Sequence, residues 1–131
     1  MPTSTVKTLF PAPIKKVWNT ITSNNDYEWR SDISKIEITI PEKEFIEYTK
    51  DGFTTKFTIT AFEPHKRYEF DMENENMYGH WTGLFSEENG QTAAEFTETV
   101  NAKKLFMKPF VGMYLKKQQA AYIRDLKKNF Q

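Results

Sequence analysis

The feature that most restricts the fold of this chain is a long run of short segments in which apolar and polar residues alternate. Between residues 32 and 100 there are six such segments, separated by turn signals such as Asp51-Gly52 and Asn89-Gly90. Alternation with a period of two is typical of strands with one buried face, and short connections favour antiparallel neighbours. The sequence therefore predicts an antiparallel meander with strands at 32–40, 44–49, 53–62, 66–73, 77–85 and 92–100.

Helical segments flank this β region. A first strand at 5–10 precedes residues 11–24, where Ile14, Val17, Trp18 and Ile21 have the spacing of one helix face. Residues from about 103 to 130 read as one long helix, which Pro109 either kinks or causes to start between 103 and 108. The face expected to lie on the sheet carries Leu105, Gly112, Leu115, Gln119, Tyr122, Ile123, Leu126 and Phe130.

A second apolar cluster lies on the other side of the long helix and comprises Phe106, Phe110, Met113 and Ala120. Either the helix is deeply embedded or this cluster packs on another subunit, so a homodimer through the helix start is one expectation. Residues 103–110 are also basic, but the stretch is short and the chain is neutral. A solvated helix start is therefore favoured over a membrane-surface patch.

Composition narrows the class of protein. The chain has 131 residues, a single domain by length (1–131), with 18 basic and 18 acidic side chains, which disfavours nucleic acid as a partner. It has no cysteine and only two histidines without ligand spacing, so we expect no disulfide, no metal site and no cofactor. No signal-like start or membrane-length apolar stretch occurs, which predicts a cytoplasmic protein without stable membrane insertion.

Three stretches make the chain recognisable: FPAPIKKVWNTITSNNDYEWRSDISKIEI at 10–38, GHWTGLF at 79–85, and FTETV at 96–100 before the basic helix. They resemble the START-like, Bet v 1-like (SRPBCC) superfamily, in its polyketide cyclase/dehydrase-type branch. The resemblance implies an α+β helix-grip fold. In that fold a seven-stranded curved antiparallel sheet wraps around a long C-terminal helix, short helices follow the first strand, and an apolar tunnel lies between sheet and helix. It does not fix the activity, because members include lipid and steroid carriers, hormone receptors, cyclases and co-chaperone domains.

Two glycines interrupt the strand at 77–85. Gly79 and Gly83 share one face with Met77 and Trp81, so large and absent side chains alternate along it. One interpretation is that each glycine leaves space for a cavity beside Trp81. The other is that the glycines only let the sheet curve, with Trp81 filling the core.

A carboxylate falls on the inward face of the last strand. Glu98 lies between Phe96 and Val100, and Gln119, or Arg30 and Tyr48 on the far wall, are its expected hydrogen-bond partners. Such a group is either an acceptor that anchors a ligand or a general base. A rim position in water, or a bulge that turns Glu98 outward, would remove it from the cavity.

Arg30 lies where the short helical region returns to the sheet, near the cavity mouth that the family resemblance implies. Its planar guanidinium suits a ligand carboxylate or phosphate. The alternative is a solvated ion pair with Asp32 and Glu28, which the proximity in sequence favours.

These observations predict a protein that binds a hydrophobic or amphipathic small molecule of lipid, polyketide or aromatic type. A cyclase or dehydratase with Glu98 as acid or base, helped by Tyr48 and Gln119, is one alternative, and a co-chaperone-like interaction domain is the other. The predicted ligand-binding residues are Trp29, Arg30, Tyr48, Phe57, Met77, Gly79, Trp81, Gly83, Phe96, Glu98, Leu115, Gln119 and Tyr122.

Overall fold

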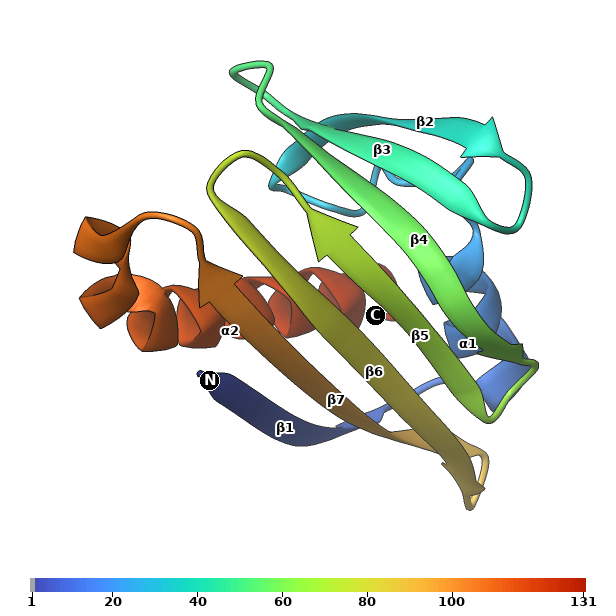
Figure 1. Ribbon diagram of the computed structural model, residues 1–131. Coiled ribbons are helices and arrows are strands. Elements are labelled where there is room, and N and C mark those ends of the chain that lie inside the picture. The colour runs from blue at the N-terminus through green and yellow to red at the C-terminus, as the bar shows by residue number, and fades with distance from the viewer. Residues whose placement is uncertain (1) are drawn as a thin grey trace.

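The computed structural model describes residues 2–131 and has the α+β order that the sequence predicts (Figure 1). Strand β1 is followed by helix α1, six further strands, a short 3₁₀ helix and a long C-terminal helix. The elements are β1 (Thr3–Phe10), α1 (Ile14–Thr22), β2 (Ile33–Ile40), β3 (Glu44–Thr49), β4 (Thr54–Glu63), β5 (Arg67–Glu73), β6 (Met77–Glu88), β7 (Gln91–Ala102), η1 (Leu105–Phe110) and α2 (Val111–Asn129).

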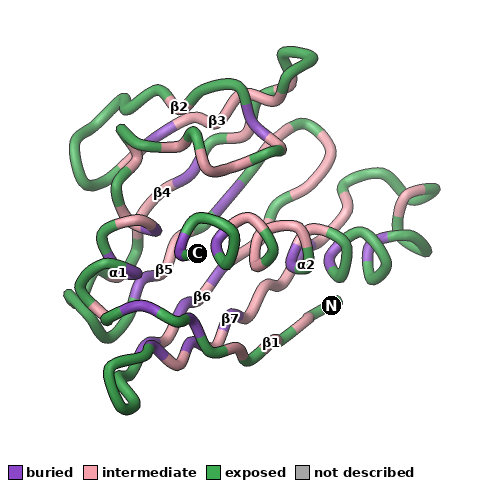
Figure 2. Tube along the Cα trace, turned by 180° about the vertical axis from the view of Figure 1, so that it is seen from behind, coloured by how far each residue is buried: buried purple, intermediate pink, exposed green. Residues whose placement is uncertain are grey.

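All seven strands form one antiparallel sheet in the order β1-β7-β6-β5-β4-β3-β2. Strands β2 to β7 are a continuous meander, and β1 completes the sheet by pairing with β7. The sheet curves around α2, which packs against β1 and β7, while α1 packs against β6 and β7 (Figures 1 and 2). The predicted helix-grip fold is confirmed.

Helix α2 presents to the sheet the face expected from its sequence. Leu115, Gln119 and Leu126 are buried and Tyr122 is half-buried, whereas Lys116, Lys117 and Arg124 are exposed. The start of the helix differs from the prediction. Residues 105–110 form η1 with Pro109 inside it, and the α-helix begins only at Val111.

Leu105 and Gly112 were therefore wrongly assigned to the buried face. Leu105 is 79% exposed and Gly112 is also exposed. Proline has no N–H and disfavours the α conformation at the residue before it, so the helix cannot run unbroken through Lys108 and Pro109. A helical wheel drawn upstream of Val111 consequently has the wrong phase.

The core is dominated by aromatic rings. Phe10, Trp18, Tyr68 and Phe96 are at most 3% exposed and belong to one cluster that joins the sheet, α1 and the C-terminal half of α2. A smaller cluster of Val100, Val111 and Leu115 lies under the N-terminal half of α2. Rings pack edge-on or stacked but leave irregular gaps between them.

Among residues 2–131, no helix is long and apolar enough to cross a membrane.

Candidate functional site

A cavity of about 170 Å³ lies between the inner face of the sheet, the loop at residues 23–32 and helix α2. Inward-facing side chains of β2 to β7 form most of its wall, and α2 closes the other side. The apolar part of the lining is Ile21, Trp29, Ile33, Ile36, Phe45, Phe53, Phe57, Phe70, Met72, Met77, Trp81 and Phe96.

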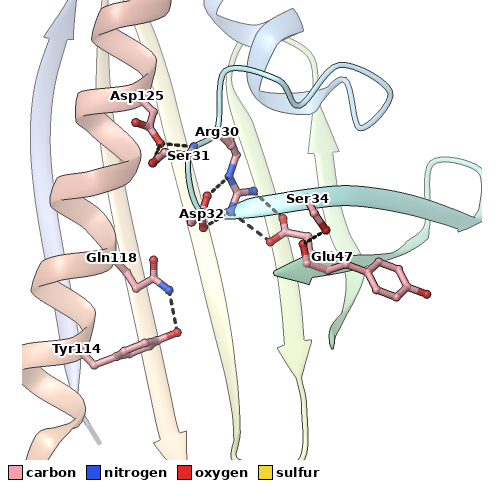
Figure 3. A network of polar contacts seen from close by, with 9 residues as sticks. Arg30, Ser31, Asp32, Ser34, Glu47, Tyr114, Gln118 and Asp125 are labelled. Carbon is pink, nitrogen blue, oxygen red and sulfur yellow. Dashed lines mark hydrogen bonds and ion pairs between the residues drawn. The ribbon is translucent and has the colours of Figure 1, made fainter. Parts of the chain in front are cut away.

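The loop at 23–32 is fixed to both neighbouring walls (Figure 3). The backbone N–H and the hydroxyl of Ser31 donate to Asp125 Oδ2 on α2 at 2.9 and 2.8 Å. The Trp29 ring packs edge-on against Tyr122 at 5.4 Å, and Arg30 reaches across to β3. These contacts make the loop a third wall of the cavity.

Arg30 is held by two carboxylates (Figure 3). Its Nε and Nη2 donate to Asp32 at 3.1 and 2.8 Å, and its Nη1 and Nη2 donate to Glu47 at 2.7 and 3.2 Å. Its side chain is 14% exposed. Burial alone lowers the pKa of Arg30, but Glu47 and Asp32 raise it further than burial lowers it, so the guanidinium stays charged. The ion-pair interpretation therefore holds with Asp32 and Glu47 as partners, in a buried setting, and Glu28 is not one of them.

Glu98 lies on the cavity wall opposite Trp81 in the β6–β7 ladder. The register of β7 with β1 and with β6 runs through Glu98 without a shift, so no bulge turns the side chain outward. Within residues 2–131 its carboxylate has no hydrogen bond and no ion pair, and none of the expected partners Gln119, Arg30 and Tyr48 bonds to it. Burial and the Glu47 charge raise the pKa of Glu98 to about 7, against the opposing effect of Arg30.

Gln119 differs from Glu98 because both of its side-chain polar atoms are hydrogen-bonded within the protein. Its Oε1 accepts from the Ser4 hydroxyl at 2.7 Å, and its Nε2 donates to the carbonyls of Ser4 and Phe96 at 2.9 and 3.4 Å. Although it also lines the cavity, its polar atoms are bonded to β1 and β7. Gln119 therefore fastens α2 to the sheet.

Tyr68 is a polar group on the cavity wall that the sequence analysis missed. It is 1% exposed, and its hydroxyl has no hydrogen-bond partner within the described chain. Burial raises the pKa of Tyr68 to about 12, and the nearby Asn24 side chain opposes that rise. Tyr68 shares the face of β5 with Phe70 and Met72 in the sheet pairing, and alternation along 66–73 was the signal that could have found it.

Glu47 was also missed, although the same alternation rule places it inward beside Phe45. That rule turns Tyr48 outward. The Tyr48 hydroxyl reaches Glu37 at 3.4 Å and Lys35 lies 4.3 Å from the ring centre, so Tyr48 is not on the cavity wall. Its predicted position at the cavity's far wall was wrong.

The space predicted above the two glycines does not exist. A Cβ atom at Gly83 would lie 2.6 and 2.7 Å from Cη2 and Cζ3 of Trp81, because the indole folds over this glycine. A Cβ atom at Gly79 would collide with the carbonyl oxygen of Thr99 on β7. The glycines allow close packing, and Trp81 fills the core as the alternative interpretation held.

The predicted site residues therefore divide into two groups. Leu115 is fully buried against Val100 and Val111, away from the cavity, and Tyr48, Gly79 and Gly83 are also absent from its wall. The structure brings the other predicted residues together around the cavity: Trp29, Arg30, Phe57, Met77, Trp81, Phe96, Glu98, Gln119 and Tyr122.

The chain belongs to the family described as "Polyketide cyclase / dehydrase and lipid transport", which matches residues 1–131. Membership suggests binding of a hydrophobic ligand. No curated protein matches the sequence.

Solved structures with similar folds come from several bacteria. The START superfamily protein from Mycobacterium smegmatis has a TM-score of 0.83 at 10% identity, covering 98% of this chain and 96% of that one. The protein XoxI from Bacillus cereus has a TM-score of 0.81 at 16% identity, covering 99% and 96%. DynU16, a protein of the dynemicin biosynthetic locus, has a TM-score of 0.77 at 14% identity, covering 98% of this chain and 46% of that one. At these identities the likeness establishes the fold.

Proposed function

We propose that this protein binds a hydrophobic or amphipathic small molecule in the cavity between the sheet and α2. The observation that carries the proposal is an apolar cavity whose wall includes polar groups without a hydrogen-bond partner among residues 2–131, namely the Glu98 carboxylate and the Tyr68 and Tyr122 hydroxyls. Apolar pockets with a few convergent polar groups are the usual form of small-molecule sites. The family description, which names lipid transport, supports a hydrophobic ligand.

The test is to fill the cavity without touching its polar groups. Ile36 lines the cavity on β2, whereas Ile38 on the same strand is 37% exposed and does not line it. We expect Ile36→Trp to abolish the backbone amide NMR shifts that benzyl alcohol causes in the wild type, and Ile38→Trp to leave them unchanged. Shifts that persist in a folded Ile36→Trp variant would place the ligand elsewhere.

A second candidate function is proton transfer, as in a cyclase or dehydratase. It is favoured by the pKa of about 7 at Glu98, since acid or base catalysts work best near the operating pH. Tyr48 cannot assist from the outer face, and the hydrogen bonds of Gln119 are already made within the protein.

Exchange of the benzylic protons of phenylacetone in D₂O, followed by NMR, tests this activity. Exchange faster than in buffer, and lost in Glu98→Gln, is the expected result for a catalytic base. Exchange at the buffer rate would contradict the catalytic proposal and leave the binding proposal intact.

We also propose that the apolar patch at the start of α2 is covered by a second copy of the chain. Leu105, Phe106, Phe110 and Met113 are 79, 73, 63 and 67% exposed, an apolar patch that supports self-association. Sedimentation at micromolar concentration should show a dimer that Phe106→Ser with Phe110→Ser converts to a monomer. A wild type that stays monomeric would contradict the proposal and leave the patch for a different protein partner.

A further inference from the structure

We infer that the ligand of the cavity carries a neutral or cationic hydrogen-bond donor, a hydroxyl or amine, on an apolar body about the size of one ring, and not a carboxylate, phosphate or sulfonate. This inference rests on the proposed binding function and names the chemical class of its ligand.

The charges around the cavity are the first argument. The charged side chains that line it, within the described residues, are one cation, Arg30, and four carboxylates, Asp26, Asp32, Glu47 and Glu98. Asp26 is exposed and the Asp32 side chain is 36% exposed, whereas the Glu47 side chain is 13% exposed and Glu98 lies opposite Trp81. A ligand anion would enter a site with an excess of negative charge, and like charges in a poorly solvated site repel strongly.

The engagement of Arg30 is the second argument. Four of the five N–H groups of a guanidinium are bonded here to Asp32 and Glu47, at 2.7 to 3.2 Å. One N–H of Arg30 remains, so an anionic ligand could bind the guanidinium in a bidentate manner only by displacing a carboxylate, which would then lie without its cation. The residue type that would ordinarily indicate an anion site is therefore already neutralised.

Glu98 and Tyr68 on the sheet wall, and the Tyr122 hydroxyl on α2, have no hydrogen bond among residues 2–131 and define what the ligand must offer. An ionised carboxylate only accepts hydrogen bonds, so the ligand group beside Glu98 must be a hydrogen-bond donor. The Tyr68 hydroxyl both donates and accepts and is compatible with the same hydroxyl or amine. The other polar or titratable groups that line the cavity from α2 are Tyr114, Gln118 and Gln119; Gln118 donates to the Tyr114 hydroxyl at 2.8 Å, and Gln119 bonds to the sheet.

The volume limits the size of the apolar body. The cavity measures about 170 Å³. An engineered cavity of roughly 150 Å³ holds one benzene molecule, whereas drug-sized ligands occupy roughly 300–1,000 Å³. A single-ring body therefore fits this cavity as it stands.

Four compounds with the same seven carbons test the inference: toluene, benzyl alcohol, benzylamine and benzoate. Each is titrated into the 15N-labelled protein at about pH 8, where Glu98 is mostly ionised, and Kd is read from amide shifts of cavity residues. We expect benzylamine and benzyl alcohol to bind at least about tenfold more tightly than benzoate. We also expect naphthalen-2-ylmethanol to bind more weakly than benzyl alcohol, because two rings exceed the cavity.

Two variants on the same strand separate the cavity charge from charge in general. Glu98→Gln should reduce the preference for benzylamine over benzoate at least about fivefold, because it removes the acceptor and the repulsion together. Glu95→Gln is the matched control: Glu95 lies on β7 three residues away, outside the cavity lining, and pairs with Lys7 at 3.5 Å. It should leave the preference unchanged.

The outcomes distinguish this inference from the binding proposal. Benzoate binding as tightly as benzylamine in the wild type, or a preference that survives Glu98→Gln, would overturn the ligand class while leaving the cavity as a binding site. Tighter binding of the two-ring alcohol would overturn the size limit. If none of the five compounds shifts the cavity resonances, the binding proposal fails, and the inference fails with it.

Discussion

Two ionisable side chains on opposite walls of the cavity, Arg30 and Glu98, differ in how many hydrogen bonds they make within the protein. On the loop side Arg30 is 14% exposed and makes four hydrogen bonds to Asp32 and Glu47. On the β7 side Glu98 has no hydrogen bond within residues 2–131. Both were candidate ligand-binding residues from the sequence, and only the count of their completed bonds separates them.

The difference shows how a buried polar residue can be assigned a role. A group whose bonds are made within the chain stabilises the fold, because removing it leaves its partners unsatisfied. A group whose bonds are open costs the fold stability and gains only when a ligand arrives. By this criterion Arg30 and Gln119 are structural, and Glu98 and Tyr68 are the residues that we propose contact a ligand.

The largest expected effect is at Arg30. Arg30→Met leaves Asp32 and Glu47 without their cation and should lower the free energy of unfolding by about 3–5 kcal/mol, measured by urea denaturation. Arg67→Met is the control, because Arg67 pairs with Glu69 on the outer face with its side chain 45% exposed, and it should change stability little. Equal losses of unfolding free energy in the two variants would contradict the structural role assigned to Arg30.

Glu98→Gln should stabilise the protein, and increasingly so as pH rises. The pKa of Glu98 is about 7 when folded and 4.5 in the reference state, so ionisation opposes folding above pH 4.5. The wild type therefore loses stability relative to the variant between these two pH values, and the difference levels off at up to roughly 3 kcal/mol above pH 7. Urea denaturation of both proteins from about pH 4.5 to 8 measures the difference; a constant difference would contradict an open, buried carboxylate.

Gln119→Leu should lower the free energy of unfolding by about 1–2 kcal/mol, because it leaves the Ser4 and Phe96 carbonyls short of a donor. The neighbouring Gln118→Leu, which removes a bond to the Tyr114 hydroxyl, should have a smaller effect. The reverse order, in urea denaturation, would show that Gln119 is not the fastening point of α2.

The smallest effect is expected at Tyr68. Tyr68→Phe removes a buried hydroxyl without a partner and should leave stability unchanged or raise it, by up to about 1 kcal/mol. Thermal denaturation measures this. A loss of more than about 1 kcal/mol would show that the hydroxyl is already satisfied and would move Tyr68 to the structural group.

Much of the fold follows from local rules, and so does part of the site. Alternation along 92–100 correctly placed Glu98 inward, and Pro109 indicated a kink or a shifted start in the last helix, which begins at Val111. Alternation identifies a face, but not which part of that face meets the cavity and which meets a helix. The prediction therefore placed Leu115 in the cavity, whereas in the structure Leu115 packs against Val100.

The remaining errors depend on tertiary packing. Nothing in the residues at 77–85 indicates that the Trp81 indole folds back over Gly83 and uses the space that the missing side chain leaves. The partner of Arg30 on β3 could not be read from its neighbours either, because Glu47 lies 17 positions along the chain. The alternation rule does place Glu47 and Tyr68 on the inward face, and applying it to every predicted strand would have identified both as cavity residues.

The pairing of β1 with β7 also has a consequence for synthesis on the ribosome. Within residues 2–131, β1 is an edge strand whose one neighbour is β7, and 96 positions separate Thr3 from Thr99. At a translation rate of about 5–20 residues per second, β1 waits for roughly 5–20 s before its partner exists. During that interval the backbone of this eight-residue segment lacks its partner strand and is open to pairing with other nascent chains.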